Sequence, residues 1–326
     1  APPVPAPVPA ETHAIEVYFT RPDEPGLRAG ERALAALVAG MDAAALSIDV
    51  ACYHINLEEV AAALLRARER GVIVRVVTDD AQAGESVLGS LARAGIEVRD
   101  DGSPALMHHK FVIIDGSEVW TGSMNLTSGS VFHDDNNLLR IRSDELAADF
   151  SREFEEMYDD GLFGALSNAD TPYPRASVDG VDVEVYFSPD DGVARRLERL
   201  VGEAEESIDV MAFAFTADGL AEAMLDRRQA GVRLRGVVER DQADSAGAEF
   251  LHLLGAGVDI RLDNSYGNMH HKVIVIDGDT VVTGSYNFTR SAETANDEAL
   301  LIFRSPWLAA AFGEEFDRRF TGASPE

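Results

Sequence analysis

The sequence predicts an α/β (α+β) protein made of two tandem, similar domains, each a mixed β-sheet flanked by helices. Three observations predict this class: short β-rich runs alternate with amphipathic helices, the same order of runs occurs twice, and the composition suits large cores. Hydrophobic residues make up 46% and charged residues 26% of the 326 residues. This composition excludes a disordered chain or a disulfide scaffold as the dominant state.

A long internal repeat reveals the duplication. Residues 16–19 return at 184–187, residues 47–50 at 207–210, and residues 107–110 at 269–272. The period is too long for a solenoid, so we interpret it as a duplicated domain whose copies are related by a pseudo-two-fold axis. The predicted organisation is a proline-rich tail at 1–13, a first domain at 14–167, a linker at 168–180 and a second domain at 181–326.

The same elements are expected in both halves. In the first half, residues 46–53 and 72–79 read as strands around a helix at 57–71; in the second, 207–215 and 232–239 read as strands around a helix at 218–231. Further strands are expected in the first half at 97–100, 108–115 and 118–123, with helices only after the Gly-Ser turn.

The charge balance restricts the function. The chain has 28 Lys and Arg against 57 Asp and Glu, a formal net charge of −29. Such a body repels polyanions at long range, which argues against tight, non-specific coating of DNA. Any anionic substrate must therefore be held by a local cationic site. The single cysteine, Cys52, excludes an internal disulfide and a cysteine-based zinc site, and no apolar run reaches the roughly 18 residues of a membrane span.

The first residues, APPVPAPVPAETHA, form a proline-rich segment without an initiator Met. We interpret this as the start of a mature protein whose signal peptide was removed, and expect a secreted or extracytoplasmic location. A truncated chain is the alternative.

Each half contains the spacing H-x-K-x4-D, followed shortly by G-S-x-N. The first copy consists of His108, Lys110, Asp115, Ser123 and Asn125, and the second of His270, Lys272, Asp277, Ser285 and Asn287. On a strand, the His and the Lys of one copy share a face, and His109 and His271 point to the other. The Ser and Asn then add hydroxyl and amide donors suited to phosphate oxygens.

At these residues the chain resembles the phospholipase D superfamily, whose signature is HxK(x)4D with a trailing GSxN. The resemblance covers nearly the whole chain after the proline-rich start, and residues 284–302 resemble the nuclease-type branch. It implies a metal-independent phosphodiesterase without a cofactor, whose two motifs form one active site. One histidine then forms a covalent phosphohistidine and the other protonates the leaving alcohol, while the two lysines neutralise charge on the phosphate oxygens.

The resemblance also suggests individual roles. Family members often place a carboxylate after GSxN, where it orients a catalytic histidine across the interface. Glu298 takes this place in the second half, and we assign Asn137 to the equivalent place in the first. Glu298 is then expected to face His108, which makes His108 the nucleophile and His270 the general acid. The near-symmetry also permits the reverse.

Several other residues have two interpretations. His109 and His271 are either metal ligands or packing residues behind the site, and the opposed strand faces favour packing. Asp115 and Asp277 are expected to be structural and to stabilise the turn that follows each of them. Four residues after the SIDV strands are candidates for a substrate mouth, although core packing is favoured for the two phenylalanines: Tyr53, His54, Phe213 and Phe215.

The substrate class stays open between nucleic acid and phospholipid. We favour a nuclease for single strands, because an unpaired backbone can enter a cleft between two halves, although the acidic surface argues against it. A secreted phospholipase D that hydrolyses or transfers phospholipid head groups is the second hypothesis, and an inert binding module the third. We expect a monomer that contains an internal pseudo-dimer.

Overall fold

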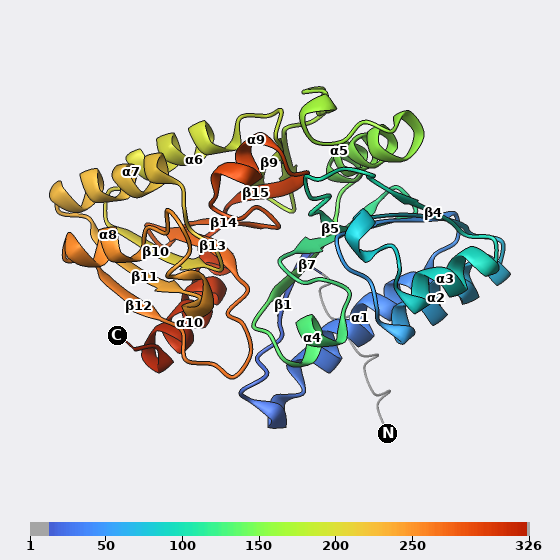
Figure 1. Ribbon diagram of the computed structural model, residues 1–326, viewed down its shortest axis with the longest axis horizontal. Helices are drawn as coiled ribbons and strands as arrows, with labels where there is room; N and C mark the ends of the chain where they lie inside the picture. The colour runs from blue at the N-terminus through green and yellow to red at the C-terminus, as the bar shows by residue number, and fades with distance from the viewer. Residues whose placement is uncertain (1–12, 325–326) are drawn as a thin grey trace, which may run out of the picture.

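The computed structural model describes residues 13–324 and contains two mixed β-sheets that lie side by side (Figure 1). The predicted tail at 1–13 falls outside the described residues except for His13. Within residues 13–324, no helix combines the length and the hydropathy that a membrane crossing requires.

The first sheet has seven strands in the order β1-β7-β6-β5-β2-β3-β4. Its strands are β1 (Ile15–Phe19), β2 (Ser47–Cys52), β3 (Ile73–Thr78), β4 (Glu97–Asp100), β5 (Lys110–Ile114), β6 (Glu118–Gly122) and β7 (Asn137–Arg142). The helices of this half are α1 (Ala29–Ala43), α2 (Glu58–Glu69), α3 (Ser86–Arg93), α4 (Ser128–Phe132) and α5 (Asp144–Glu155), with short helical turns η1 (Pro25–Leu27), η2 (Asp80–Gln82), η3 (Glu156–Asp160) and η4 (Gly164–Leu166).

The second sheet has eight strands in the order β12-β11-β10-β13-β14-β15-β9-β8. Its strands are β8 (Arg175–Val178), β9 (Val181–Ser188), β10 (Ser207–Ala212), β11 (Arg233–Val238), β12 (Asp259–Leu262), β13 (Lys272–Ile276), β14 (Thr280–Gly284) and β15 (Glu298–Arg304). The helices are α6 (Val193–Gly202), α7 (Asp218–Gln229), α8 (Phe250–Gly255), α9 (Arg290–Thr294) and α10 (Pro306–Gly322), with a turn η5 (Arg240–Gln242). Read from β9 to β12, the second sheet has the order β9-β15-β14-β13-β10-β11-β12, which corresponds strand by strand to the order of the first sheet. This correspondence confirms the duplicated fold.

Part of the segment predicted as a linker, 168–180, belongs to the second sheet instead. Residues 175–178 form the edge strand β8 and pair with β9 in antiparallel register. The turn between them contains Asp179 and Gly180, both with positive φ, as a tight hairpin turn requires. Two prolines lie just before β8, and its four residues give only a short alternating pattern, so the local sequence is typical of a linker.

One hydrophobic core joins the two halves. It contains residues of both sheets together with α5 and α10. Each half has one further core, between its sheet and its outer helices. Phe150 of α5 packs edge-on against Phe187 of β9, with ring centroids 5.2 Å apart. Phe312 of α10 packs in the same way against Phe19 of β1, at 5.1 Å. These reciprocal contacts fix the position of one half against the other.

The aspartates of the two motifs have a structural role. The Asp115 carboxylate accepts hydrogen bonds from the backbone N–H groups of Ala45, Leu46 and Ser47, at the start of β2. Asp277 does the same for residues 205–207. The aspartates were expected to stabilise the turn after them, but their carboxylates tie the end of β5 or β13 to the loop before the neighbouring strand.

We expect Asp115→Ala to lower the free energy of unfolding by about 1.5–3 kcal/mol, the range for hydrogen bonds to a charged group. Asp115 also has a φ of 53°, which alanine adopts less readily than aspartate. Urea unfolding measures the effect, with the exposed Glu314→Gln variant as the control. A change no larger than that of the control contradicts this role.

Candidate functional site

The two His-Lys segments meet between the halves, and each is attached to the half it does not belong to. The backbone N–H of His108 donates to the carbonyl of Asp297 at 2.9 Å. The backbone N–H of His270 donates to the carbonyl of Asp135, also at 2.9 Å. The two histidines and two lysines therefore form one composite site, as the sequence predicted.

The imidazole of His108 is held by the carboxylate expected to face it. His108 Nδ1 lies 2.7 Å from Glu298 Oε2, and both side chains are buried. A carboxylate only accepts hydrogen bonds, so Nδ1 carries the proton of the neutral ring. The lone pair of Nε2 is then free to react.

Asn136, and not Asn137, occupies the corresponding place beside the second histidine. His270 Nδ1 lies 2.9 Å from Asn136 Oδ1 and 3.1 Å from the carbonyl of Ser123. Asn136 Nδ2 donates to the carbonyl of Ser130, which fixes the orientation of the amide. Both neighbours of Nδ1 are therefore acceptors, and His270 has the same tautomer as His108.

The assignment of Asn137 was wrong by one residue. Asn136 and Glu298 are 162 positions apart, the same separation as His108 and His270. Asn137 instead points to the opposite side, where its Nδ2 lies 3.1 Å from His271 Nδ1. The spacing of the repeat was the signal that identified Asn136.

The two lysines lie beneath the histidines and are almost fully buried. Lys110 Nζ donates to the carbonyl of His108 and Lys272 Nζ to that of His270, both at 2.8 Å. Burial lowers the pKa of Lys110 to about 8, although Glu298 acts in the opposite direction. Burial and the neighbouring Lys110 lower the pKa of Lys272 as well. Each ammonium group keeps donors free for an anion.

Lys110 and Lys272 are the only two lysines in the chain; the other 26 of the 28 basic residues are arginines. A lysine's ammonium changes its pKa readily on burial, whereas a guanidinium stays charged. The chain thus has its ammonium side chains only in this site.

The other titratable groups of the site are also shifted by burial. Burial lowers the pKa values of His108 and His270, and the two lysines lower them further. Burial raises the pKa of Glu298 to about 7, against the effect of both lysines. An anion bound here opposes the shifts of the lysines and histidines, since it stabilises their charged forms.

The residues of the two Gly-Ser-x-Asn turns separate into two groups. Ser123 Oγ donates to Asn136 Oδ1 at 2.9 Å, and Ser285 acts to lower the pKa of the Glu298 carboxyl. The serines therefore support the groups that orient the histidines. Asn125 and Asn287 each have a buried Oδ1 without a hydrogen-bond partner. Their amides are available to a ligand.

Two of the four candidate mouth residues contact the site. The Tyr53 ring lies 5.2 Å from that of His108, and Phe213 lies 4.6 Å from His270. Lys272 Nζ is 4.7 Å from the Phe213 ring centroid. Core packing was favoured for Phe213, but its ring flanks the site, whereas Phe215 is buried in the core. The His54 side chain pairs with Glu85 at 2.7 Å.

His109 and His271 lie behind the site, on the opposite strand face, as expected. His109 Nε2 is 2.8 Å from Glu153 Oε1, and burial lowers the pKa of His109 to about 3. Between residues 13 and 324, the one cluster with metal-ligand spacing consists of Asp79, Asp80 and Asp101. Both oxygens of Asp79 already accept backbone hydrogen bonds, so we assign it a structural role.

A charged network supports the His270 side of the site and was not predicted. Asp135, whose carbonyl holds His270, receives Arg318 at 2.5 Å and Arg319 at 2.8 Å through its carboxylate. The equivalent residue, Asp297, accepts the Gly164 backbone N–H at 2.6 Å instead. The partners of Asp135 are more than 180 positions away in the sequence, and no local pattern indicates them.

A family model described as "Cardiolipin synthase, PLD-like domain" matches residues 37–158 and again residues 197–320. The chain belongs to the phospholipase D superfamily. Each match spans one copy of the motif, so the two phospholipase D-like domains of the chain are those seen in the fold.

Relatives of known name resemble one part of the chain. The human mitochondrial cardiolipin hydrolase is 39% identical over 136 residues, covering 41% of this chain and 54% of that protein. The Chlamydomonas reinhardtii enzyme of the same name is 35% identical over 133 residues, covering 41% of this chain and 59% of that protein. A phospholipase D of Rickettsia prowazekii is 30% identical and covers 48% and 77%. The chain thus spans less than two thirds of the cardiolipin hydrolases it matches.

Among solved structures, the phosphatidylserine synthase of Haemophilus influenzae matches 94% of this phospholipase D-like chain and 87% of its own, with a TM-score of 0.68 and 14% identity. That likeness concerns the fold alone. Nuc of Salmonella typhimurium, described as a phospholipase D family member, is 30% identical and covers 44% of this chain and 96% of its own, with a TM-score of 0.41.

We expect ¹⁵N-lysine labelling to give two Nζ signals, one of which titrates near pH 8. Burial disfavours the charged amine of Lys110, so its pKa lies below the ordinary 10.5. Lys110→Arg assigns the signal, and a bound phosphate-type anion should raise the midpoint. A pKa of about 10.5 for both lysines contradicts the burial of these amines.

Proposed function

We propose that this protein is a metal-independent phosphodiesterase that works through a covalent phosphohistidine on His108, with His270 as the general acid. The observation that carries this proposal is the unequal pair of orienting groups in one site: Glu298 on His108, and Asn136 on His270. The two otherwise similar histidines therefore have different electrostatic partners.

In the first step, the Nε2 lone pair of His108 attacks phosphorus, and the bond from phosphorus to the leaving oxygen breaks. Protonated His270 gives its Nε2 proton to that oxygen, which leaves as an alcohol. In the second step, neutral His270 takes a proton from water as the water oxygen attacks phosphorus. The phosphorus–nitrogen bond then breaks, which restores His108 and protonated His270.

The lysines and asparagines bind the phosphate throughout both steps. Lys110 and Lys272 each hold a carbonyl with one hydrogen bond and have donors left for non-bridging oxygens. We assign the amide groups of Asn125 and Asn287, whose Oδ1 atoms have no hydrogen-bond partner, to the same oxygens. Four fixed donors supply the charge stabilisation that metal ions give in other phosphodiesterases.

Glu298 favours His108 as the nucleophile. Attack turns the His108 ring into a positively charged phospho-imidazolium, and a carboxylate on Nδ1 stabilises that charge. An amide gives His270 less stabilisation of its charged form, which suits an acid that must release its proton.

For the substrate, we propose a single-stranded nucleic acid. Tyr53 and Phe213 flank the two histidines on either side, and aromatic rings at such positions suit the bases next to a cleaved phosphate. A phospholipid is the second candidate, supported by the names of the relatives, cardiolipin hydrolase and phospholipase D.

We expect hydrolysis of bis(4-nitrophenyl) phosphate, a small diester that tests the chemistry independently of the natural substrate. Activity should persist in excess EDTA, because lysines replace metal ions. His108→Ala and His270→Ala should each lose at least about 10²-fold in rate, the lower range for general acid–base catalysis. His54→Ala, outside the composite site, is the control. If either histidine variant retains most of the activity, the two histidines do not share one active site.

We expect the enzyme to cleave oligothymidylate faster than it cleaves cardiolipin that is presented in mixed vesicles. The two rates are compared at the same ionic strength. Replacing the flanking rings in Tyr53→Leu and Phe213→Leu should weaken oligonucleotide cleavage, because stacking contributes about 1–3 kcal/mol per base. Hydrolysis of the small diester should change far less. Lipid cleavage without oligonucleotide cleavage assigns the enzyme to phospholipids instead.

We expect the covalent phosphoryl group on His108. Acid-labile phosphopeptides from enzyme quenched during turnover should contain residue 108. The Asn136→Asp variant supplies a carboxylate to His270 and so serves as a matched test of the orienting group. In this variant, part of the covalent phosphoryl group should be found on His270. A phosphoryl group on His270 in the unmodified enzyme would make His270 the nucleophile and His108 the general acid.

A further inference from the structure

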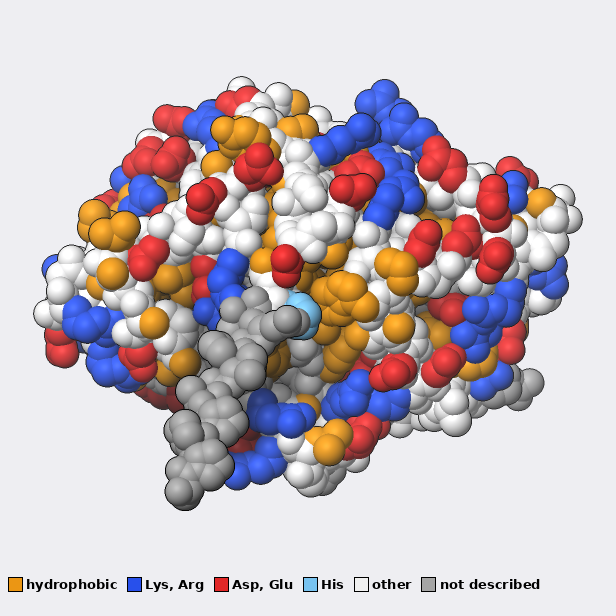
Figure 2. All heavy atoms as spheres, turned by 180° about the vertical axis from the view of Figure 1, so that it is seen from behind, with side chains coloured by type: hydrophobic (Ala, Val, Ile, Leu, Met, Phe, Trp, Pro, Cys, Tyr) orange, Lys and Arg blue, Asp and Glu red, His pale blue; other side chains and the backbone are white. Residues whose placement is uncertain are grey.

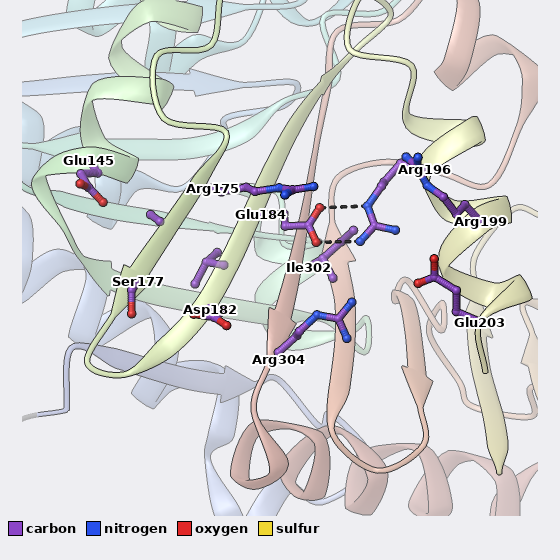
Figure 3. Close-up of a pocket in the computed structure, with 12 residues that line it drawn as sticks. Glu145, Arg175, Ser177, Asp182, Glu184, Arg196, Arg199, Glu203, Ile302 and Arg304 are labelled. Atoms are coloured by element: carbon purple, nitrogen blue, oxygen red, sulfur yellow. Dashed lines mark hydrogen bonds and ion pairs between the residues drawn. The ribbon is translucent and has the colours of Figure 1, made fainter. Parts of the chain in front are cut away.

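A second concave site lies on the outer side of the second sheet, where β8, β9 and β15 meet α6 (Figure 3). We call it the arginine groove, after Arg175, Arg196, Arg199 and Arg304 in its lining. Its volume is about 880 Å³. Glu298 and Arg304 are six residues apart on β15, which corresponds to about 20 Å along a strand. The groove is therefore separate from the histidine site.

One of the four arginines is neutralised within the groove. Arg196 is buried and holds Glu184 with two parallel hydrogen bonds of 2.9 and 2.7 Å. Figure 3 shows this pair in the middle of the groove, with the Arg175 side chain beside Glu184. The pair forms the floor of the groove and needs no further partner.

The other three arginines are exposed and make no ion pair with the described part of the chain. The Arg304 side chain donates to Thr280 at 3.5 Å, and the side chains of Arg175 and Arg199 have no hydrogen-bond partner there. Basic side chains also gather at the upper right of the face in Figure 2, over the region of α6 and β9. Three guanidinium groups thus remain available to a ligand.

Carboxylates line the groove as well but do not pair with these arginines. Glu145, Asp182 and Glu203 contribute to its walls. Asp182 stands opposite Arg304 in the strand register, yet Figure 3 shows the Arg304 guanidinium pointing toward α6 and away from Asp182. The carboxylates therefore bound the groove without occupying its donors.

The first half shows what a neutralised version of this position looks like. Arg142 is the repeat equivalent of Arg304 and pairs with Glu16 and Glu118. At the position of Glu118 the second half has Thr280. One of the two carboxylates that hold Arg142 is thus missing from the second half. The equivalent of the other, Glu184, is held by Arg196, and Arg304 is left without an ion pair.

We propose that the arginine groove binds a small, multiply charged phosphate-bearing anion through Arg175, Arg199 and Arg304. Guanidinium groups match phosphate oxygens with paired hydrogen bonds, and the groove has the size of a small-molecule site. The rest of the molecule carries a large negative charge, so anions concentrate only where donors are unpaired. This binding site is independent of the proposed phosphodiesterase activity.

Arginine modification by phenylglyoxal, read residue by residue by mass spectrometry, tests the groove directly. The histidine site contributes lysines and no arginine, so it does not confuse the result. Pyrophosphate at about ten times its dissociation constant should slow modification of Arg199 and Arg304 about tenfold, since only free protein reacts. Arg195, on the same helix as Arg199, and Arg93, at the end of α3, are both exposed and serve as controls. Phenylglyoxal should modify these two arginines at the same rate in pyrophosphate and in sodium chloride of equal ionic strength.

Calorimetry with pyrophosphate gives the second measurement. The Arg199→Gln/Arg304→Gln protein should lose the binding component that the Arg195→Gln protein keeps. Both proteins should still hydrolyse bis(4-nitrophenyl) phosphate at the unmodified rate, which separates this proposal from the proposed function. Equal protection of all exposed arginines, or identical calorimetric curves, overturns the groove as a site. Protection by oligothymidylate but not by pyrophosphate also overturns it, because the ligand is then a strand and not a small anion.

Discussion

Each site histidine is hydrogen-bonded to the half of the molecule to which it does not belong, and the chemistry of the site depends on this exchange. The carbonyl of Asp297 holds the His108 backbone, and the carbonyl of Asp135 holds that of His270. The next residue in each case, Glu298 or Asn136, then reaches the imidazole itself. The two halves must therefore be docked before either ring is oriented. The Phe150–Phe187 and Phe312–Phe19 contacts in the shared core set that docking.

The duplicated fold holds two copies of one motif in environments that differ in charge. On one side a carboxylate orients the ring, and the side chain of its neighbour Asp297 accepts a backbone N–H. On the other side an amide orients the ring, and Asp135 is neutralised by two arginines of α10. Geometry is thus nearly symmetric while electrostatics is not. An unequal charge distribution of this kind suits a reaction in which one histidine must attack and the other must release a proton.

Much of the fold was predictable because local sequence patterns determine its strands and helices. The strand at 47–52 and the helix at 58–69 follow from alternation and amphipathic spacing, and Gly71 ends that helix with a φ of 89°. The motif residues were found for the same reason, since the repeat shows them twice. What failed depended on short or distant signals. β8 has only four residues, the Arg318 and Arg319 network joins distant segments, and Phe213 reads as core until its contact with His270 is seen. Asn136 was missed although the spacing of the repeat identified it.

The division of labour between lysine and arginine explains how so acidic a protein keeps a cationic site. Arginines stay charged at any ordinary pH, and most of those in the described chain are held by carboxylates, as Arg142 is by Glu16. They stabilise the fold without creating a free positive surface. The two lysines are buried where their charge depends on what is bound beside them. An incoming phosphate therefore strengthens the cations that hold it, because it opposes the lowering of their pKa values. The unpaired arginines of the groove depart from this arrangement, and for that reason we assign them a ligand.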